Sequence, residues 1–123
     1  MSDELLHHGY EQSRLLSDDE KLLLTALLSN RADFRHLNQQ IVSGKVIDML
    51  DGGMGSVKFL TAEERSLGAT LVEAEYLDTD GVPVSIVINA DNRGDLYELD
   101  FWKVDFSSLK QFPRPEQVKM RAG

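Results

Sequence analysis

The carboxylates of this sequence are its most promising chemical groups, and four of them alternate within two segments of strand-like composition. Glu73 and Glu75 lie in one segment, and Glu98 and Asp100 lie in the other, followed by Trp102, the only tryptophan. Alternate residues of a strand point to the same face of a sheet, so each pair should share a face. Carboxylates attract basic proteins, and tryptophan often anchors interfaces. We therefore predict a partner-binding face that consists of Glu73, Glu75, Glu98, Asp100 and Trp102.

The same carboxylates are weak candidates for catalysis. Acid–base chemistry requires a cleft and a raised pKa, and an open sheet face is expected to provide neither. His7, His8 and His36 lack the spacing of metal-ligand pairs, no serine has a Gly-x-Ser-x-Gly context, and there is no cysteine. The Asp78–Gly81 turn resembles the start of a calcium loop, but Asn89 stands where that loop needs a bidentate glutamate. We therefore predict no enzymatic activity, no metal and no cofactor.

A second candidate site is the glycine-rich run from Asp51 to Ser56. It lacks the Lys-Ser/Thr ending of a phosphate-binding loop, and no helix is expected to follow it. We favour a hairpin turn in which the glycines adopt positive φ. The alternative is a ligand-binding loop that consists of Asp51, Gly52, Gly53, Gly55 and Ser56.

Composition indicates one domain of ordinary size, with 123 residues and a formal net charge of −8 from 13 basic and 21 acidic residues. This charge repels phosphate backbones and disfavours nucleic acid, but it can steer a basic protein toward the surface. The apolar runs are too short to cross a membrane, and the first residues lack the features of a signal peptide. Together with the absence of cysteine, these features predict a cytoplasmic protein without a membrane partner.

Two helices are expected before residue 44. Ser17 and Glu20 form the pattern of a capping box, which predicts a leucine-rich helix that begins there and ends near Ser29. A second helix, over about residues 32–40, is indicated by apolar residues spaced three and four apart, with Asp33 in its first turn.

From residue 44 onward apolar and polar residues alternate, as in half-buried strands. We predict five strands, over residues 45–50, 56–60, 69–78, 82–90 and 96–106. The expected fold class is α+β, a five-stranded antiparallel meander with one or two N-terminal helices packed on one face. Residues 1–14 are expected to form a flexible leader, 15–111 the domain and 112–123 a tail, because Pro113 and Pro115 should end regular structure.

The turns between the predicted strands set their register. A two-residue turn at Asp78–Gly81 would bury Glu73 and Glu75 against isoleucine, so we expect a longer, bulged turn. The expected neighbours are then Val72 and Ile88, Ala74 and Ile86, Tyr76 and Val84, Ile88 and Tyr97, Ile86 and Leu99, Val84 and Phe101, Ile47 and Phe59, and Met49 and Val57. All of these apolar residues share one core face, and the opposite face contains Asp48, Lys58, Glu73, Glu75, Ser85, Val87, Glu98, Asp100 and Trp102.

Three motifs resemble those of a family of small bacterial proteins of unknown function. They are a DGGMGS hairpin at residues 51–56, a D-x-D-G turn at residues 78–81 and the strand motif L-x-E-L-D-x-W-K at residues 96–103. The further matching positions are Val46, Met49 and Phe59. The resemblance covers about Leu15 to Leu109 and implies no catalytic residues.

In size and charge the chain is also similar to the immunity proteins that bacteria pair with secreted toxins. We therefore predict a non-catalytic protein-binding module, most concretely an immunity-type inhibitor of a basic toxin. One alternative is a small-ligand-binding or regulatory domain that uses the Gly52–Gly55 hairpin. Another is a homo-oligomeric structural protein; the sequence leaves the oligomeric state open.

Overall fold

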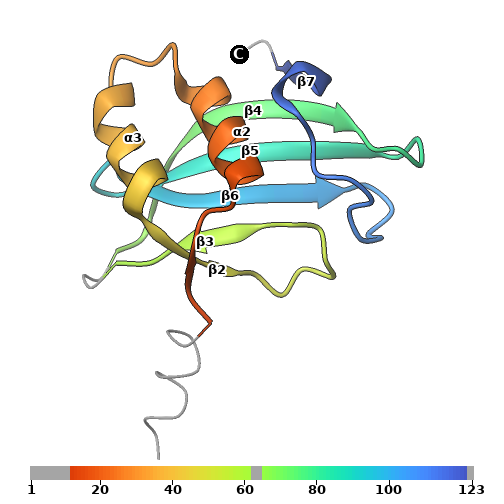
Figure 1. Cartoon of the computed structure of the whole chain (residues 1–123), viewed down its shortest axis with the longest axis horizontal. Coiled ribbons are helices and arrows are strands. Elements are labelled where there is room, and N and C mark those ends of the chain that lie inside the picture. Colours follow the sequence, from red (N-terminus) through yellow and green to blue (C-terminus); the bar gives the residue numbers. More distant parts are fainter. Residues whose placement is uncertain (1–11, 62–64, 122–123) are drawn as a thin grey trace, which may run out of the picture.

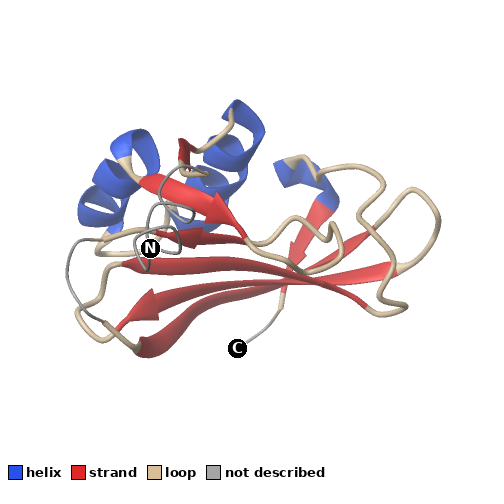
Figure 2. Ribbon diagram, turned by 90° about the horizontal axis from the view of Figure 1, so that it is seen from below, coloured by secondary structure: helices blue, strands red, loops and turns tan. Residues whose placement is uncertain are grey.

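The structure is a computed structural model that describes residues 12–61 and 65–121, and these residues form a seven-stranded antiparallel sheet (Figure 1). The strand order is β1-β2-β3-β6-β5-β4-β7. The strands are β1 (Arg14–Leu15), β2 (Lys45–Asp48), β3 (Val57–Phe59), β4 (Leu67–Leu77), β5 (Pro83–Asp91), β6 (Leu96–Lys103) and β7 (Val118–Met120). Two α-helices, α2 (Asp18–Leu28) and α3 (Phe34–Ser43), and the 3₁₀ turn η1 (Pro115–Gln117) lie on the same side of the sheet (Figure 2).

The predicted α+β class is confirmed, but the five-stranded meander is wrong. Only β4, β5 and β6 form a meander, and β3 pairs with β6 instead of β4. A meander would place β6 at the edge of the sheet. Leu96, Leu99 and Phe101 of β6 are all buried, and the insertion of β6 between β3 and β5 covers them on both sides.

Helix α2 begins as the sequence predicts. The backbone N–H of Glu20 donates to Ser17 Oγ (3.1 Å), and the backbone N–H of Ser17 donates to Glu20 Oε1 (2.8 Å). Helix α3 begins after Asp33, whose carboxylate does not cap it but accepts from Arg31 Nε (2.9 Å). None of the described helices is long and apolar enough to cross a membrane.

The predicted register is confirmed between β4 and β5 and wrong at two other pairs. Val72 lies opposite Ile88, as the bulged turn requires. Ile88 pairs with Leu99 and not with Tyr97, a shift of two residues. The loop that joins Asp91 to Asp95 contains three residues, and a bulge between β5 and β6 displaces the pairing by one further residue. The other β5–β6 pairs move with it: Ile86 lies opposite Phe101 and Val84 opposite Lys103, in place of Leu99 and Phe101.

The first hairpin is shifted by one residue from the prediction. Phe59 lies opposite Val46, not Ile47, and Val57 lies opposite Asp48, not Met49. A shift of one residue exchanges the two faces of a strand, so Val46 is buried while Ile47 is only half-buried. The shift also moves Asp48 off the predicted acidic face.

Strand β1 accounts for the position of Asp48. Arg14 Nη2 of β1 lies 2.8 Å from Asp48 Oδ1, and Arg14 Nη1 lies 2.7 Å from Glu20 Oε1 of α2. Arg14 therefore belongs to the sheet although it lies in the predicted leader, of which residues 1–11 fall outside the described residues.

The C-terminal residues also join the sheet, in contrast to the predicted tail. η1 and β7 follow Pro113, and β7 pairs with β4 through Ala74 opposite Met120 and Tyr76 opposite Val118. Pro115 begins η1 instead of ending regular structure, since the first positions of a helical turn need no donated backbone hydrogen bond.

Candidate functional site

The five residues of the predicted partner-binding face lie on adjacent strands in aligned rows. Glu73 of β4 and Asp100 of β6 flank Val87 of β5, and Glu75 and Trp102 flank Ser85 in the next row. Glu98 lies one row further along β6, opposite Asn89 of β5.

The β4 half of this face is compensated by a basic residue. Arg121, which follows β7, places Nη1 3.6 Å from Glu73 Oε1 and Nη2 3.4 Å from Glu75 Oε1. Lys119 of β7 also lies opposite Glu75. Treating residues 112–123 as a tail hid these cations from sequence reasoning, and they make Glu73 and Glu75 poor candidates for binding an external partner.

The β6 half of the face borders a hollow of about 650 Å³, which lies beside the loop between β2 and β3. Nine residues line the hollow: Met49, Asp51, Met54, Ser56, Val87, Asp100, Phe101, Trp102 and Phe106. The predicted partner-binding face and the predicted ligand loop therefore meet here, because each supplies two of the lining residues.

The glycine-rich loop shapes the hollow and is tied down by its own polar groups. The two carboxylate oxygens of Asp51 accept from the backbone N–H groups of Met54 (3.1 Å) and Ser56 (3.0 Å). Ser56 Oγ accepts from the backbone N–H of Phe101 (2.8 Å) and also lies 3.3 Å from its carbonyl oxygen. The loop is thereby attached to β6.

The glycines of the loop do not line the hollow. Gly52, Gly53 and Gly55 all have positive φ, which confirms the backbone conformation predicted for them, and none of them lines the hollow. A Cβ on Gly53 would lie 3.1 Å from Ser108 Cβ, and the Gly53 carbonyl accepts from the backbone N–H of Leu109 (3.0 Å). The glycines therefore allow the segment after β6 to pack closely against the loop.

Asp100 is half-buried beside the hollow and has an unusual acidity. Burial, together with the negative charges of Glu98 and Asp51, raises the pKa of Asp100 to about 6. Asn89 Nδ2 donates to Asp100 Oδ2 (3.2 Å) and to Glu98 Oε1 (3.4 Å). The expectation that an open sheet face offers neither a cleft nor a raised pKa is therefore wrong at this position.

Two aromatic side chains form an exposed wall of the hollow. Trp102 is 54% exposed and Phe106 is 63% exposed, and their rings meet edge to face with centroids 5.0 Å apart. Phe106 has φ +62°, an unfavourable conformation for a residue with a large side chain. The sequence predicts Phe106 only as the last residue of the strand over residues 96–106, and no local pattern marks it or the two methionines as lining residues.

A buried ion cluster holds the segment that carries Phe106. Lys103 is fully buried, and its Nζ lies 2.8 Å from Asp78 Oδ2, 2.6 Å from Asp80 Oδ2 and 3.0 Å from the carbonyl oxygen of Ser108. Asp78 also accepts from the backbone N–H of Lys110 (2.8 Å). The cluster joins the D-x-D-G turn to the end of β6, so both motifs have a structural role.

The ionisation of the cluster follows from these contacts. Burial alone would raise the pKa of Asp78, but the hydrogen bonds from Lys103 and from backbone N–H groups outweigh it and lower the pKa to about 2. Burial would likewise lower the pKa of Lys103, but its bonds to Asp78 and Asp80 outweigh this effect and raise it. Asp78 and Lys103 are therefore both charged at neutral pH.

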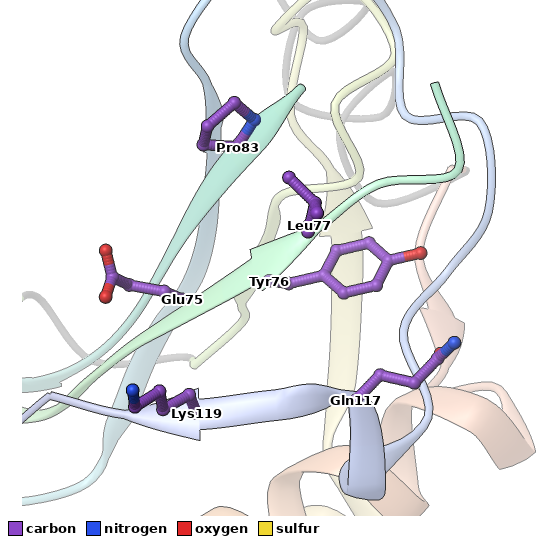
Figure 3. Close-up of a pocket in the computed structure, with 6 residues that line it drawn as sticks. All are labelled: Glu75, Tyr76, Leu77, Pro83, Gln117 and Lys119. Atoms are coloured by element: carbon purple, nitrogen blue, oxygen red, sulfur yellow. The ribbon is translucent and has the colours of Figure 1, made fainter. Parts of the chain in front are cut away.

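A second depression on the surface of the described residues is smaller than the hollow. Where β7 meets β4, a depression of about 300 Å³ is lined by Glu75, Tyr76, Leu77, Pro83, Gln117 and Lys119 (Figure 3). The Tyr76 hydroxyl already donates to the Gln111 carbonyl (3.0 Å). Within residues 12–61 and 65–121, no three acidic or histidine side chains are grouped so that they could hold a metal ion.

The comparisons with known proteins give a family but no activity. A family model described as a domain of unknown function (DUF6984) matches residues 13–113, which include every residue that lines the hollow. No curated protein and no solved structure matches the chain. β7 and Arg121 lie beyond the matched range.

Proposed function

Because the chain belongs to the DUF6984 family, whose description names no activity, we propose a function from the geometry of the hollow. The protein is a non-catalytic binding module that recognises a basic protein through Glu98, Asp100 and Trp102. The observation that carries this proposal is the contrast between the two halves of the acidic face. Arg121 compensates Glu73 and Glu75, whereas Asp100 has no ion-pair partner among the described residues.

The composition of the hollow favours protein recognition. Trp102 is the residue type most enriched at the energetic centres of interfaces, and it is half exposed beside an acidic group. A basic partner that covers the hollow would exclude water from Asp100 and strengthen their attraction.

The polar groups of the hollow favour binding over catalysis. Acid–base chemistry uses a second group that acts on the substrate together with the first. The carboxylate of Asp51 and the hydroxyl of Ser56 both line the hollow, but each is engaged in holding the loop to itself or to β6. Asp100 therefore acts as a charge that attracts a cation.

In its most concrete form, the proposal is that the protein is an immunity-type inhibitor of a basic toxin or nuclease. The net charge of −8 supports this form, since it steers a basic partner at long range. A captured partner should lose its toxic or nuclease activity when one equivalent of the protein is added.

The proposal is tested by affinity capture from a lysate of the source organism at low salt. Three baits are compared: the unchanged protein, Asp100→Lys and Glu116→Lys. Glu116 lies in η1, away from the hollow lining, and its substitution changes the net charge equally. We expect a basic protein that binds the first and third baits, is absent from the second, and elutes as salt is raised. Equal capture by all three baits would contradict the proposal.

A small ligand is a second candidate occupant, and the size of the hollow favours it. Its volume of about 650 Å³ falls within the range of small-molecule sites. Thermal unfolding with small organic cations, compared with a lysine-rich peptide, separates the two functions. A midpoint raised by a small cation alone would favour a ligand-binding domain.

Gel filtration tests the hypothesis that the protein is a homo-oligomer. Elution at the size of a monomer would exclude that hypothesis.

A further inference from the structure

We propose that the hollow is a socket for a single lysine side chain of the basic partner. The aliphatic part of that lysine packs against Trp102 and Phe106, and its ammonium group lies at Asp100 and Asp51. This inference rests on the proposed function and specifies the group that the partner inserts.

The charges around the hollow are complementary to a cation. Asp51 and Asp100 both line it, and neither has an ion-pair partner within the described part of the chain. Glu98, which lies on β6 together with Asp100, adds a third negative charge. An entering cation therefore meets two carboxylates that no cation of the described chain already neutralises.

The charged residues on the neighbouring strands do not cancel the negative charge around the hollow. On β3, Lys58 lies opposite Glu98, and its Nζ sits 5.3 Å from the centre of the Tyr97 ring. On β4, Glu73 lies across Val87 from Asp100 and is paired with Arg121, which follows β7.

The apolar lining requires an occupant with a long apolar stem. Met49, Met54 and Val87 accompany the two aromatic rings in the hollow, so a hydrated inorganic ion would leave most of the lining without contacts. Lysine combines a four-carbon chain with a charged end, and such a side chain gains from burying its stem while its charge meets a carboxylate. The exposed rings of Trp102 and Phe106 also attract cations.

The hydrogen bonds of the two carboxylates favour lysine over arginine. A guanidinium pairs best with a carboxylate that offers both oxygens in one plane. Both oxygens of Asp51 already accept from loop N–H groups, and Asp100 Oδ2 accepts from Asn89. An ammonium group has three diverging donors and can bond to one oxygen of each carboxylate.

The conformation of Phe106 is consistent with a prepared site. Its positive φ is a strained arrangement, and such strain is tolerated where a side chain must be held in one direction. The Lys103 cluster and the glycine-rich loop hold the flanking residues at Ser108 and Leu109. The aromatic wall is therefore positioned before a partner arrives, which reduces the entropy lost on binding.

The experiment uses capped pentapeptides, Gly-Gly-X-Gly-Gly, with lysine, arginine, norleucine or acetyl-lysine at X. Binding to the full chain is followed by the fluorescence of Trp102, the only tryptophan. We expect the lysine peptide to bind about tenfold more tightly than the norleucine and acetyl-lysine peptides, which lack the charge. Equal or tighter binding of the arginine peptide would overturn the choice of lysine.

The pH dependence gives an independent readout. Only about one carboxyl in ten with a pKa of about 6 is ionised at pH 5, so lysine-peptide affinity should fall about tenfold between roughly pH 8 and pH 5. The variant Asp100→Asn should remove this dependence and weaken binding, while the control Glu75→Gln should change neither. An unchanged pH profile in Asp100→Asn would overturn the assignment.

A parallel titration with decalysine separates the two proposals. If decalysine binds in an Asp100-dependent manner but the single-lysine peptide does not, the socket is wrong and the acidic binding face remains. If neither binds the folded protein, both proposals fail.

Discussion

At the scale of single residues, Asp100 shows how a binding group can reduce stability. Its pKa of about 6 lies above the ordinary value of 3.8, so the folded protein binds this proton more tightly than the unfolded chain does. The ionised form is therefore the less stable one in the fold. Below about pH 4 the group is protonated in both the folded and the unfolded chain, and its tighter proton binding contributes fully to the stability of the fold. As the pH rises through 6, this contribution to stability is lost.

This sign predicts the behaviour of Asp100→Asn, which cannot ionise. The variant should be more stable than the unchanged protein at pH 8, and the difference should shrink toward about pH 4. Urea unfolding at both pH values measures the difference. A stability difference that does not change with pH would show that Asp100 has an ordinary pKa.

Phe106 is the second residue whose conformation matters, because its φ is positive and its ring is 63% exposed. We predict that Phe106→Gly is more stable than Phe106→Ala by about 1 kcal/mol, since glycine adopts positive φ without the steric cost of a Cβ. Thermal unfolding of the two variants tests this. Both remove the ring, so both should weaken binding of the lysine peptide to a similar extent.

At the scale of elements, the sheet is completed by segments that lie far apart in the sequence. β1 and β7 are the two edge strands of the sheet. β7 also places Arg121, which follows it, beside Glu73 and Glu75. The segment after β6 is held by Lys103, which joins it to the turn between β4 and β5. These connections position the aromatic wall of the hollow.

The Lys103 cluster gives a prediction for this segment. Lys103→Met should lower the midpoint of thermal unfolding by about 10 °C, because it leaves Asp78 and Asp80 without their cation. Lys110→Met removes an exposed lysine and serves as the control. A variant of Lys103 as stable as the control would show that the cluster contributes little.

The same cluster has a defined pH dependence. Because the pKa of Asp78 is lowered to about 2, its stabilising contribution is present above the ordinary value of 3.8 and is lost as the pH falls through 2. In the unchanged protein this contribution should therefore be the same at pH 7 and pH 5. In contrast, the effect of Asp100→Asn changes over that range.

At the scale of the whole molecule, the helices cover one face of the sheet (Figure 2). The acidic side chains alternate with the core residues along β4 and β6 and therefore lie on the other face. The net charge of −8 gives a long-range field, while the residues beside the hollow give a local one. These two contributions can be separated, because variants of equal net charge can place the change at different sites.

We predict that Glu98→Lys slows association with a basic partner or decalysine about tenfold, whereas Glu116→Lys slows it much less. Both substitutions change the net charge by the same amount, and only the first lies beside Asp100. Stopped-flow fluorescence at low salt measures the rates. Equal rates for the two variants would assign the steering to net charge alone.

Much of the local structure could be predicted from the sequence. The capping box at Ser17 located the start of α2, and alternation located the strands from β2 to β6. The register between β4 and β5 followed from the cost of burying Glu73 and Glu75 against isoleucine. These features depend on neighbours that are close in the sequence.

The candidate site could be predicted only in part. Glu98, Asp100 and Trp102 were recognised from their spacing, and Asp51 and Ser56 from the glycine-rich run. Asp51, Ser56, Asp100 and Trp102 line one hollow because β6 inserts beside β3, which no local pattern specifies. Glu73 and Glu75 pair with Arg121, which follows β7, a strand that sequence reasoning missed because Pro113 and Pro115 precede it.

By itself, the sequence determined the fold class, the first helix, the alternating strands and the acidic character of one face, because each follows from propensity and periodicity along the chain. The tertiary structure alone decided which carboxylates are compensated and which one has a raised pKa. The physical reason is that burial and electrostatic attraction depend on distance in space. Asp51, Asp100 and Phe106 become neighbours of one hollow only when the sheet is assembled.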